Sequence, residues 1–191
     1  MGNSKVSIQK KIVVGLLVLW VVLVVVVGLI RSGIISSGRV VIYFFQTNQN
    51  GKAYLVEVER DAKLSFRTDL SEKIMFALTE LIAGPSQEES SKGLISCVPQ
   101  DARVLSVKKE GDIIYVDFSQ EIEYGGGIWE IKGRLAQIVF TSTQFDPDDG
   151  VRILIEGKEI KSFSGEGITD VEKPMYRNDF SDFLKGEKNE R

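Results

Sequence analysis

Three carboxylates, Asp117, Glu121 and Glu123, lie close together and are the residues whose types and spacing could do chemistry. Paired carboxylates serve as acid and base in glycoside hydrolysis, so the group suggests an enzyme acting on a wall polysaccharide. Asp117 and Ser119, however, end a predicted strand, where such side chains accept backbone N–H bonds from the following turn. We therefore predict a structural role for Asp117 and Ser119.

The chain contains no histidine and a single cysteine, Cys97. The usual general base, the base of a serine-protease triad and the commonest zinc ligand are therefore missing. Cys97 has no partner for an intramolecular disulfide, and a thiol without a neighbouring histidine is a weak nucleophile. We expect Cys97 to be an ordinary, partly buried residue, and we predict no enzymatic activity, no metal site and no cofactor.

A run of three glycines at 125–127 precedes a predicted helix. Phosphate-binding loops have this arrangement, because helix N-termini bind anions. The Lys-Ser/Thr ending and the preceding strand pattern of such loops are absent from the sequence, so a hinge is the better interpretation.

Polar residues recur along this predicted helix, which is the second of two in the chain. Lys132, Arg134 and Gln137 are expected to face away from the apolar side of the helix. Thr141 and Gln144 are either a polar contact surface or, as we prefer, partners in hydrogen bonds at the helix end. The candidate interaction surface comprises Asp117, Ser119, Arg134, Gln137, Thr141 and Gln144.

An apolar run from Ile12 to Ile30 contains no charged or strongly polar side chain. As a helix it would span about 28 Å, close to the roughly 30 Å hydrocarbon core of a bilayer. We predict an uncleaved transmembrane signal anchor, with a signal peptide cleaved near residues 36–38 as the alternative. Three lysines in the flank 1–11 favour a cytoplasmic N-terminus, which places the remaining chain outside the cytoplasm.

In the rest of the chain we predict a tether at 31–39, one domain at 40–163 and a charged tail at 164–191. We expect the tail to have no fixed structure beyond local docking. Apolar alternation and turn signals predict three β-hairpins, and helical spacing predicts two helices. The hairpins lie over 40–46 and 54–60, 104–109 and 112–118, and 151–156 and 159–163; the helices lie over 70–83 and 128–143.

This order, ββα-ββα-ββ, predicts an α+β fold in which two helices pack on one face of a largely antiparallel sheet. The connection at 85–101 is expected to touch the core only at Leu94 and Ile95. The formal net charge is −3, with 24 basic and 27 acidic residues. No basic run lies outside the N-terminal flank, so nucleic-acid binding is not expected.

Seven segments in order carry a family resemblance: VVIYFF at 40–45, YLVEVER at 54–60, LTELIAGP at 78–85, GLISCVP at 93–99, VKKEGDIIYVDFS at 107–119, LAQIVFTSTQF at 135–145 and VRILIEGKEI at 151–160. Together they resemble the GerMN domain of bacterial sporulation and spore germination proteins. The resemblance implies an extracytoplasmic α+β module with no established enzymatic activity, similar in build to ring-building domains of secretion assemblies. Members are often lipoproteins, whereas this chain has no lipobox cysteine and carries one copy of the domain.

Two functions are consistent with these observations. The first is a non-catalytic interaction module in the cell envelope, held in the inner membrane by a single span from Ile12 to Ile30. It would associate with itself or with envelope partners through a sheet edge or the second helix. The alternative is a protein that binds or modifies peptidoglycan through its exposed carboxylates.

Overall fold

The computed structural model describes residues 14–27, 38–62, 64, 68–163 and 171–184. Residues 14–27 form an α-helix in which every side chain is exposed. Among the residues described, none of the helices combines the length and the apolar character needed to cross a membrane. The ends of the predicted span, 12–13 and 28–30, lie outside the described residues, as do the flank 1–11 and the tether residues 31–37.

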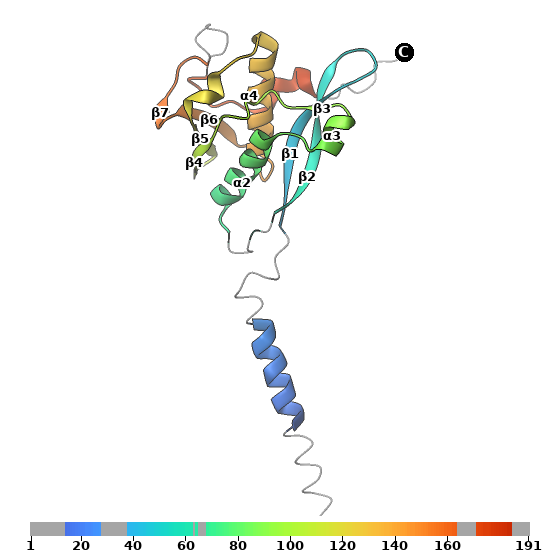
Figure 1. Ribbon diagram of the computed structural model, residues 1–191. Helices are drawn as coiled ribbons and strands as arrows, with labels where there is room; N and C mark the ends of the chain where they lie inside the picture. Colours follow the sequence, from blue (N-terminus) through green and yellow to red (C-terminus); the bar gives the residue numbers. More distant parts are fainter. Residues whose placement is uncertain (1–13, 28–37, 63, 65–67, 164–170, 185–191) are drawn as a thin grey trace, which may run out of the picture. The chain divides into compact units, whose positions relative to one another are not determined.

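The first hairpin forms a three-stranded sheet, called sheet A, with strand order β2-β1-β3 (Figure 1). Strands β1 (Gly38–Thr47) and β2 (Ala53–Ala62) are the predicted pair, and the Asn48 side chain accepts two backbone N–H bonds in the turn between them. The third strand, β3 (Leu94–Ile95), forms where an apolar contact was expected, and it pairs antiparallel with β1 at Phe45. Leu94 is buried as expected, but Ile95 is exposed, and the connection is buried at Cys97 and Val98 instead.

The second sheet, called sheet B, has the order β4-β5-β6-β7. Its members are β4 (Val104–Glu110), β5 (Ile113–Phe118), β6 (Gly150–Ile155) and β7 (Lys158–Glu159). The hairpin of β4 and β5 is confirmed, but β5 and β6 are parallel, so the sheet is mixed. A helix links β5 to β6, and such a crossover returns the chain in the same direction. The third hairpin closes on only two residue pairs.

Both predicted helices are present, as α2 (Leu70–Ala83) and α4 (Ile128–Ser142). Asp69 caps α2 by accepting the N–H of Glu72 at 2.7 Å, and Gly84 ends the helix with a φ of 82°. A short helix that was not predicted, α3 (Gln87–Ser91), begins with a reciprocal capping box between Ser86 and Glu89. The α+β class is therefore correct.

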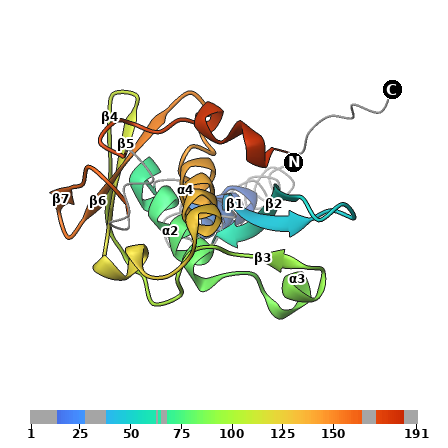
Figure 2. The same ribbon diagram turned by 90° about the horizontal axis from the view of Figure 1, so that it is seen from above.

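Helix α4 lies between the two sheets, with α2 packed beside it (Figures 1 and 2). The expected layer of two helices on one sheet is therefore wrong, because α4 has protein on nearly all sides from Ile131 onward. Gly133 permits this close approach, since a Cβ there would lie 3.0 Å from both the Cys97 Sγ and the Phe45 ring.

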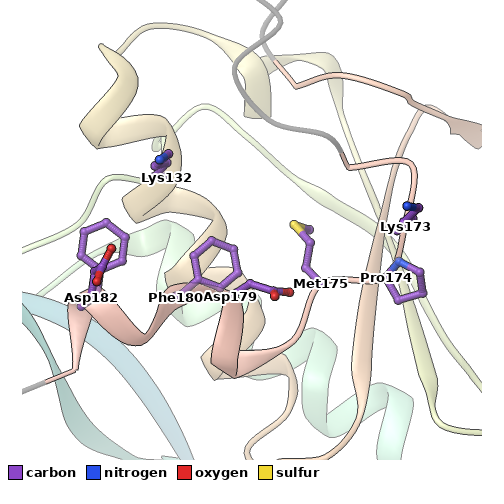
Figure 3. A pocket seen from close by; sticks show the side chains of 8 residues that line it. Lys132, Lys173, Pro174, Met175, Asp179, Phe180 and Asp182 are labelled. Atoms are coloured by element: carbon purple, nitrogen blue, oxygen red, sulfur yellow. The ribbon is translucent and has the colours of Figure 1, made fainter.

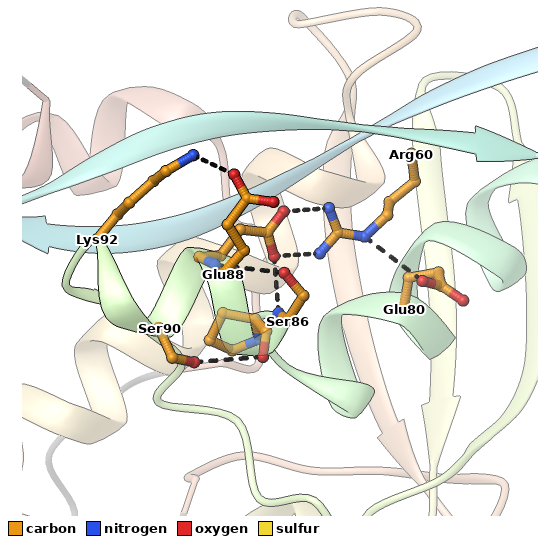
Figure 4. A network of polar contacts seen from close by, with 8 residues as sticks. Arg60, Glu80, Ser86, Glu88, Ser90 and Lys92 are labelled. Atoms are coloured by element: carbon orange, nitrogen blue, oxygen red, sulfur yellow. Dashed lines mark hydrogen bonds and ion pairs between the residues drawn. The ribbon is translucent and has the colours of Figure 1, made fainter.

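A polar network ties sheet A to the helices beside it (Figure 4). Arg60 on β2 donates two hydrogen bonds, of 2.5 and 2.6 Å, to the carboxylate of Glu89 in α3. It also lies 3.6 Å from Glu80 of α2. One guanidinium thus connects a strand to two helices.

The described part of the tail, residues 171–184, packs on the domain, and we call it the C-terminal strap. It contains the 3-10 helix η2 (Arg177–Phe183). Val171, Met175 and Phe180 of the strap are buried. The local docking expected for the tail therefore extends over the whole strap, while 164–170 and 185–191 lie outside the described residues.

Candidate interaction surfaces

The polar residues predicted on the second helix line one edge of β1. Gln137 Nε2 donates to the Tyr43 carbonyl at 2.9 Å, and the Tyr43 N–H donates to Thr141 Oγ1 at 3.2 Å. One turn further along, Gln144 both accepts from the Val41 N–H at 2.6 Å and donates to the Val41 carbonyl at 3.1 Å.

These contacts replace a neighbouring strand. β3 pairs with β1 only at Phe45 and Gln46, so the remainder of that edge would hold unpaired backbone groups. Unpaired buried backbone groups cost free energy comparable to a lost hydrogen bond. Residues 137, 141 and 144 recur at helical spacing, and this spacing lets α4 supply side-chain partners along a strand. Their role is to close the edge of β1.

Gln137 also acts in the opposite direction, because its Oε1 accepts the Cys97 N–H at 2.7 Å. A single buried amide thereby joins β1 to the segment that precedes β4. Thr141 is likewise buried, whereas Gln144 is half-buried.

Arg134 is a buried cation held by carbonyl groups. It is 3% exposed and donates to the carbonyls of Cys97, Ile122, Tyr124 and Gly125 at 2.5 to 3.1 Å. Its burial lowers the pKa of the guanidinium from the usual value. The side chain fastens the segment before α4 to the helix.

The prediction that Arg134 and Gln137 face away from the core is therefore wrong, while Lys132 is exposed as expected. The amphipathic pattern was interpreted for a helix covered on one side only. Because α4 lies between two sheets, its second face is also buried, and the polar residues there bond to backbone.

Asp117 and Ser119 lie at the end of β5, away from this network. Asp117 Oδ1 accepts the N–H of Gly157 at 2.9 Å, and Ser119 Oγ accepts the N–H of Arg103 at 3.0 Å. Both accept backbone N–H groups, as predicted, although from segments other than the following turn. The six candidate residues therefore do not form one surface.

The pKa of Glu121 is shifted away from the direction that acid catalysis requires. A hydrogen bond from Ser119 lowers the pKa of Glu121, whereas a catalytic acid at neutral pH requires a raised one. Across the described ranges, no three metal-ligating side chains gather in one place. Cys97 is buried, and this burial raises the pKa of its thiol to about 12, which suppresses the reactive thiolate.

The glycine run at 125–127 leads into α4, whose N-terminus already binds a carboxylate. Glu130 Oε2 accepts the Gly127 N–H at 3.1 Å, so a negative group already occupies the start of α4. An acidic side chain at this position opposes the binding of phosphate. Within the run, Gly126 has a φ of 95°, and a Cβ there would lie 3.0 Å from the Glu130 Cβ, so this position favours glycine.

An exposed apolar surface lies where β1, α4 and the strap meet. The rings of Phe45, Trp129 and Phe183 contact one another, with centroids 5.1 to 6.1 Å apart. Next to them in sequence, Ile128 is 57% exposed and Leu184 44%. Trp129 is 43% exposed, whereas Phe45 is fully buried. We call Trp129, Phe183, Ile128 and Leu184 the aromatic surface. The sequence reasoning missed it, although the aromatic residues spaced through the charged tail were a signal.

A cavity of about 360 Å³ lies between the strap and α4 (Figure 3). Lys132 of α4 and Met175, Asp179 and Phe180 of the strap line it. Its lining mixes apolar and charged side chains.

The fold and these contacts define a small α+β module in which the most prominent polar side chains hold the backbone together. The chain belongs to the family described as "Germane: Sporulation and spore germination", whose sequence pattern matches residues 41–161. The suspected GerMN relationship is thereby confirmed, and the domain is a sporulation- and germination-related one.

Solved structures agree with this assignment. The first GerMN domain of the sporulation protein GerM from Bacillus subtilis is 24% identical, with a TM-score of 0.57, over 74% of this chain and 98% of that one. The tandem GerMN domains of the same protein give 24% and 0.54, and the match spans 74% of this chain but only 45% of theirs.

A putative lipoprotein from Clostridium perfringens is 26% identical, with a TM-score of 0.50, over 76% of this chain and 91% of that one. Among curated protein sequences, none matches this chain. The GerM structures, at 24% identity, support the fold alone.

Proposed function

We propose that this protein is a non-catalytic interaction module of the bacterial envelope, which associates with itself or with sporulation-type partners. One observation carries the proposal: the conspicuous polar side chains are engaged inside the fold, while the exposed aromatic surface lies free to contact protein. Exposed apolar residues that lie together mark protein or membrane contacts.

We further propose that the run from Ile12 to Ile30 anchors the protein in the inner membrane, with the domain outside the cytoplasm. The described portion, residues 14–27, is helical and exposes large apolar side chains such as Leu16, Leu19 and Trp20, which lipid would cover. Three lysines precede this run, and such a flank favours a cytoplasmic N-terminus. This supports a single-pass topology.

The test combines topology with association. In cells, membrane fractionation and protease accessibility of the domain from outside the cytoplasm should both be positive; recovery in the cytosolic fraction would overturn the anchor. Sedimentation of the detergent-solubilised full chain should show self-association that weakens in Trp129→Ala. Lys158→Ala, an exposed change on β7 outside the aromatic surface and the cavity, is the control and should leave association unaltered.

A pull-down on isolated peptidoglycan tests the alternative. Neither retention nor turnover is expected, and Asp117→Asn and Glu121→Gln should change nothing. Retention abolished by these variants would instead support a wall-binding protein.

A further inference from the structure

The C-terminal strap binds the domain as a peptide ligand binds a receptor. Its first contacts are between backbones: Val171 N–H donates to the Lys161 carbonyl at 3.2 Å, and Met175 exchanges two hydrogen bonds with Val151 of β6, at 2.8 and 2.9 Å. The strap thus adds one residue pair to the edge of β6 that β7 leaves open. This is the main-chain contact of β-augmentation.

Arg177 supplies the specific side-chain contact. Its Nε donates to Thr143 Oγ1 at 2.8 Å, and one Nη donates to the Phe140 carbonyl at 3.1 Å, near the end of α4. The guanidinium also lies over the rings of Phe140 and Tyr43, at 4.8 and 5.5 Å from their centroids. A planar cation that stacks and donates at once gives orientation as well as affinity.

Two phenylalanines complete the docking. Phe180 is buried against the domain, and Phe183 contacts Phe45 and, on the aromatic surface, Trp129. The cavity shown in Figure 3 lies beside Phe180 and shows that the strap fills its groove incompletely.

All of these anchors lie within residues 171–184, beyond the part of the chain that matches the family at 41–161. The strap therefore carries its own set of contacts, while the groove belongs to the family domain. The connecting segment 164–170, SGEGITD, contains two glycines and no large aromatic residue.

We propose that the groove on β6, α4 and β1 is a binding site for residues 171–184, and that the strap of a second copy of the chain fills it when two copies meet. This inference rests on the proposed self-association, to which it gives a mechanism. Strap contacts within one chain and between two chains would be identical, so exchange requires only that each strap leave the groove of its own chain. Anchoring in one membrane would raise the effective concentration and favour exchange.

Cysteine trapping tests the exchange in the full chain. Val151 and Met175 form a hydrogen-bonded antiparallel pair, whose Cα separation of about 5.5 Å suits a disulfide. Both variants, Val151→Cys and Met175→Cys, are made with Cys97→Ser to remove the native thiol. After mixing and mild oxidation, we expect a disulfide-linked dimer on a non-reducing gel. The double variant in one chain should give mainly an internal disulfide.

A matched control distinguishes exchange of the strap from disulfides that form when two chains collide at random. Met175→Cys mixed with Asn50→Cys, an exposed position in the turn between β1 and β2, should give at least tenfold less dimer. Adding Arg177→Ala to the trapping pair should speed dimer formation several-fold, because the strap opens more readily.

If wild-type chains associate but the trapping mixture yields no more dimer than the control, strap exchange is wrong and the proposed function stands. If wild-type chains stay monomeric and the mixture still gives no dimer, both proposals fail. Efficient trapping that Arg177→Ala slows would also contradict a strap that must open first.

Discussion

Two strand edges in this domain are closed in different ways. The edge of β1 receives side chains from α4 and the segment just after it, with Gln137, Thr141 and Gln144 bonding to the backbone of Val41 and Tyr43. The edge of β6 receives the backbone of the strap at Met175. In both cases, a strand that would otherwise present free N–H and C=O groups is protected.

The difference lies in what holds the protecting group. Gln137 and Thr141 belong to a helix buried between two sheets, so they leave the edge only if the domain unfolds. The strap is held by a few hydrogen bonds and three buried side chains, and segments with few buried contacts open locally at lower free energy. The β1 edge is therefore closed by side chains fixed in the core, whereas the β6 edge is closed by a segment that can leave in the exchange we propose.

The largest effect should come from Gln137→Leu, which breaks the closure of β1. The change leaves the buried Cys97 N–H and the Tyr43 carbonyl without their partners, at about 1–3 kcal/mol for each group and about 3 kcal/mol in total. Urea unfolding should show the loss. Gln144→Leu, at a half-buried position with the same chemistry, is the comparison and should cost less. If both variants lose the same free energy of unfolding, burial does not determine the size of the loss.

A smaller and local effect is expected for Arg177→Ala in the strap. The loss of two hydrogen bonds and ring stacking should cost about 1–2 kcal/mol. Hydrogen exchange should accelerate in residues 171–184 and leave β1 unchanged. Arg177→Lys keeps the positive charge but loses the planar guanidinium. Its exchange rates should therefore lie between those of the wild type and of Arg177→Ala. Faster exchange throughout the domain would mean that the strap is part of the cooperative core.

Acid should weaken the ion pair that ties sheet A to α3. The hydrogen bonds from Arg60 hold the pKa of Glu89 at about 2, below its usual value of 4.5. A lowered carboxylate pKa stabilises the fold above about pH 4.5, and that contribution is lost as pH falls toward 2. Glu89→Gln should flatten this part of the stability curve. If wild type and variant fall in parallel, other carboxylates dominate.

The smallest effect should be seen at Cys97. Because burial raises the pKa of its thiol to about 12, alkylation of the folded protein at pH 8 should be slow and should proceed only through opening. Gln137→Leu leaves the backbone N–H of Cys97 without its partner and should accelerate alkylation. Arg177→Ala should not. Such a contrast reports which closure protects the interior.

Local patterns predicted the elements well. Helix α2 has the predicted bounds because Asp69 and Gly84 are unambiguous capping residues. The hairpin of β4 and β5 followed from alternation around Gly111, whose φ of 58° suits a tight turn. The short helix α3 was missed because it has no buried residue and hence no apolar period.

Arrangement was harder to predict, because it depends on contacts distant in sequence. Nothing local indicates that β6 runs parallel to β5 or that α4 has a sheet on each side. Arg134 and Gln137 were therefore selected as surface residues, although their polar groups serve buried backbone. Asp117 and Ser119 do accept backbone N–H groups, as their position at a strand end predicted, but the donors, Gly157 and Arg103, lie 40 and 16 residues away in sequence and not in the following turn.

The closure of β1 also has a consequence for biosynthesis. Val41 and Tyr43 are separated by 94 to 103 residues from the amides that complete them. The strand is therefore made early by the ribosome and stays open until almost the whole domain has followed. Such long-range pairing is slow to form. Nascent chains that stop short of residue 137 will expose an unpaired strand edge. Chaperones and proteases are expected to bind these species first.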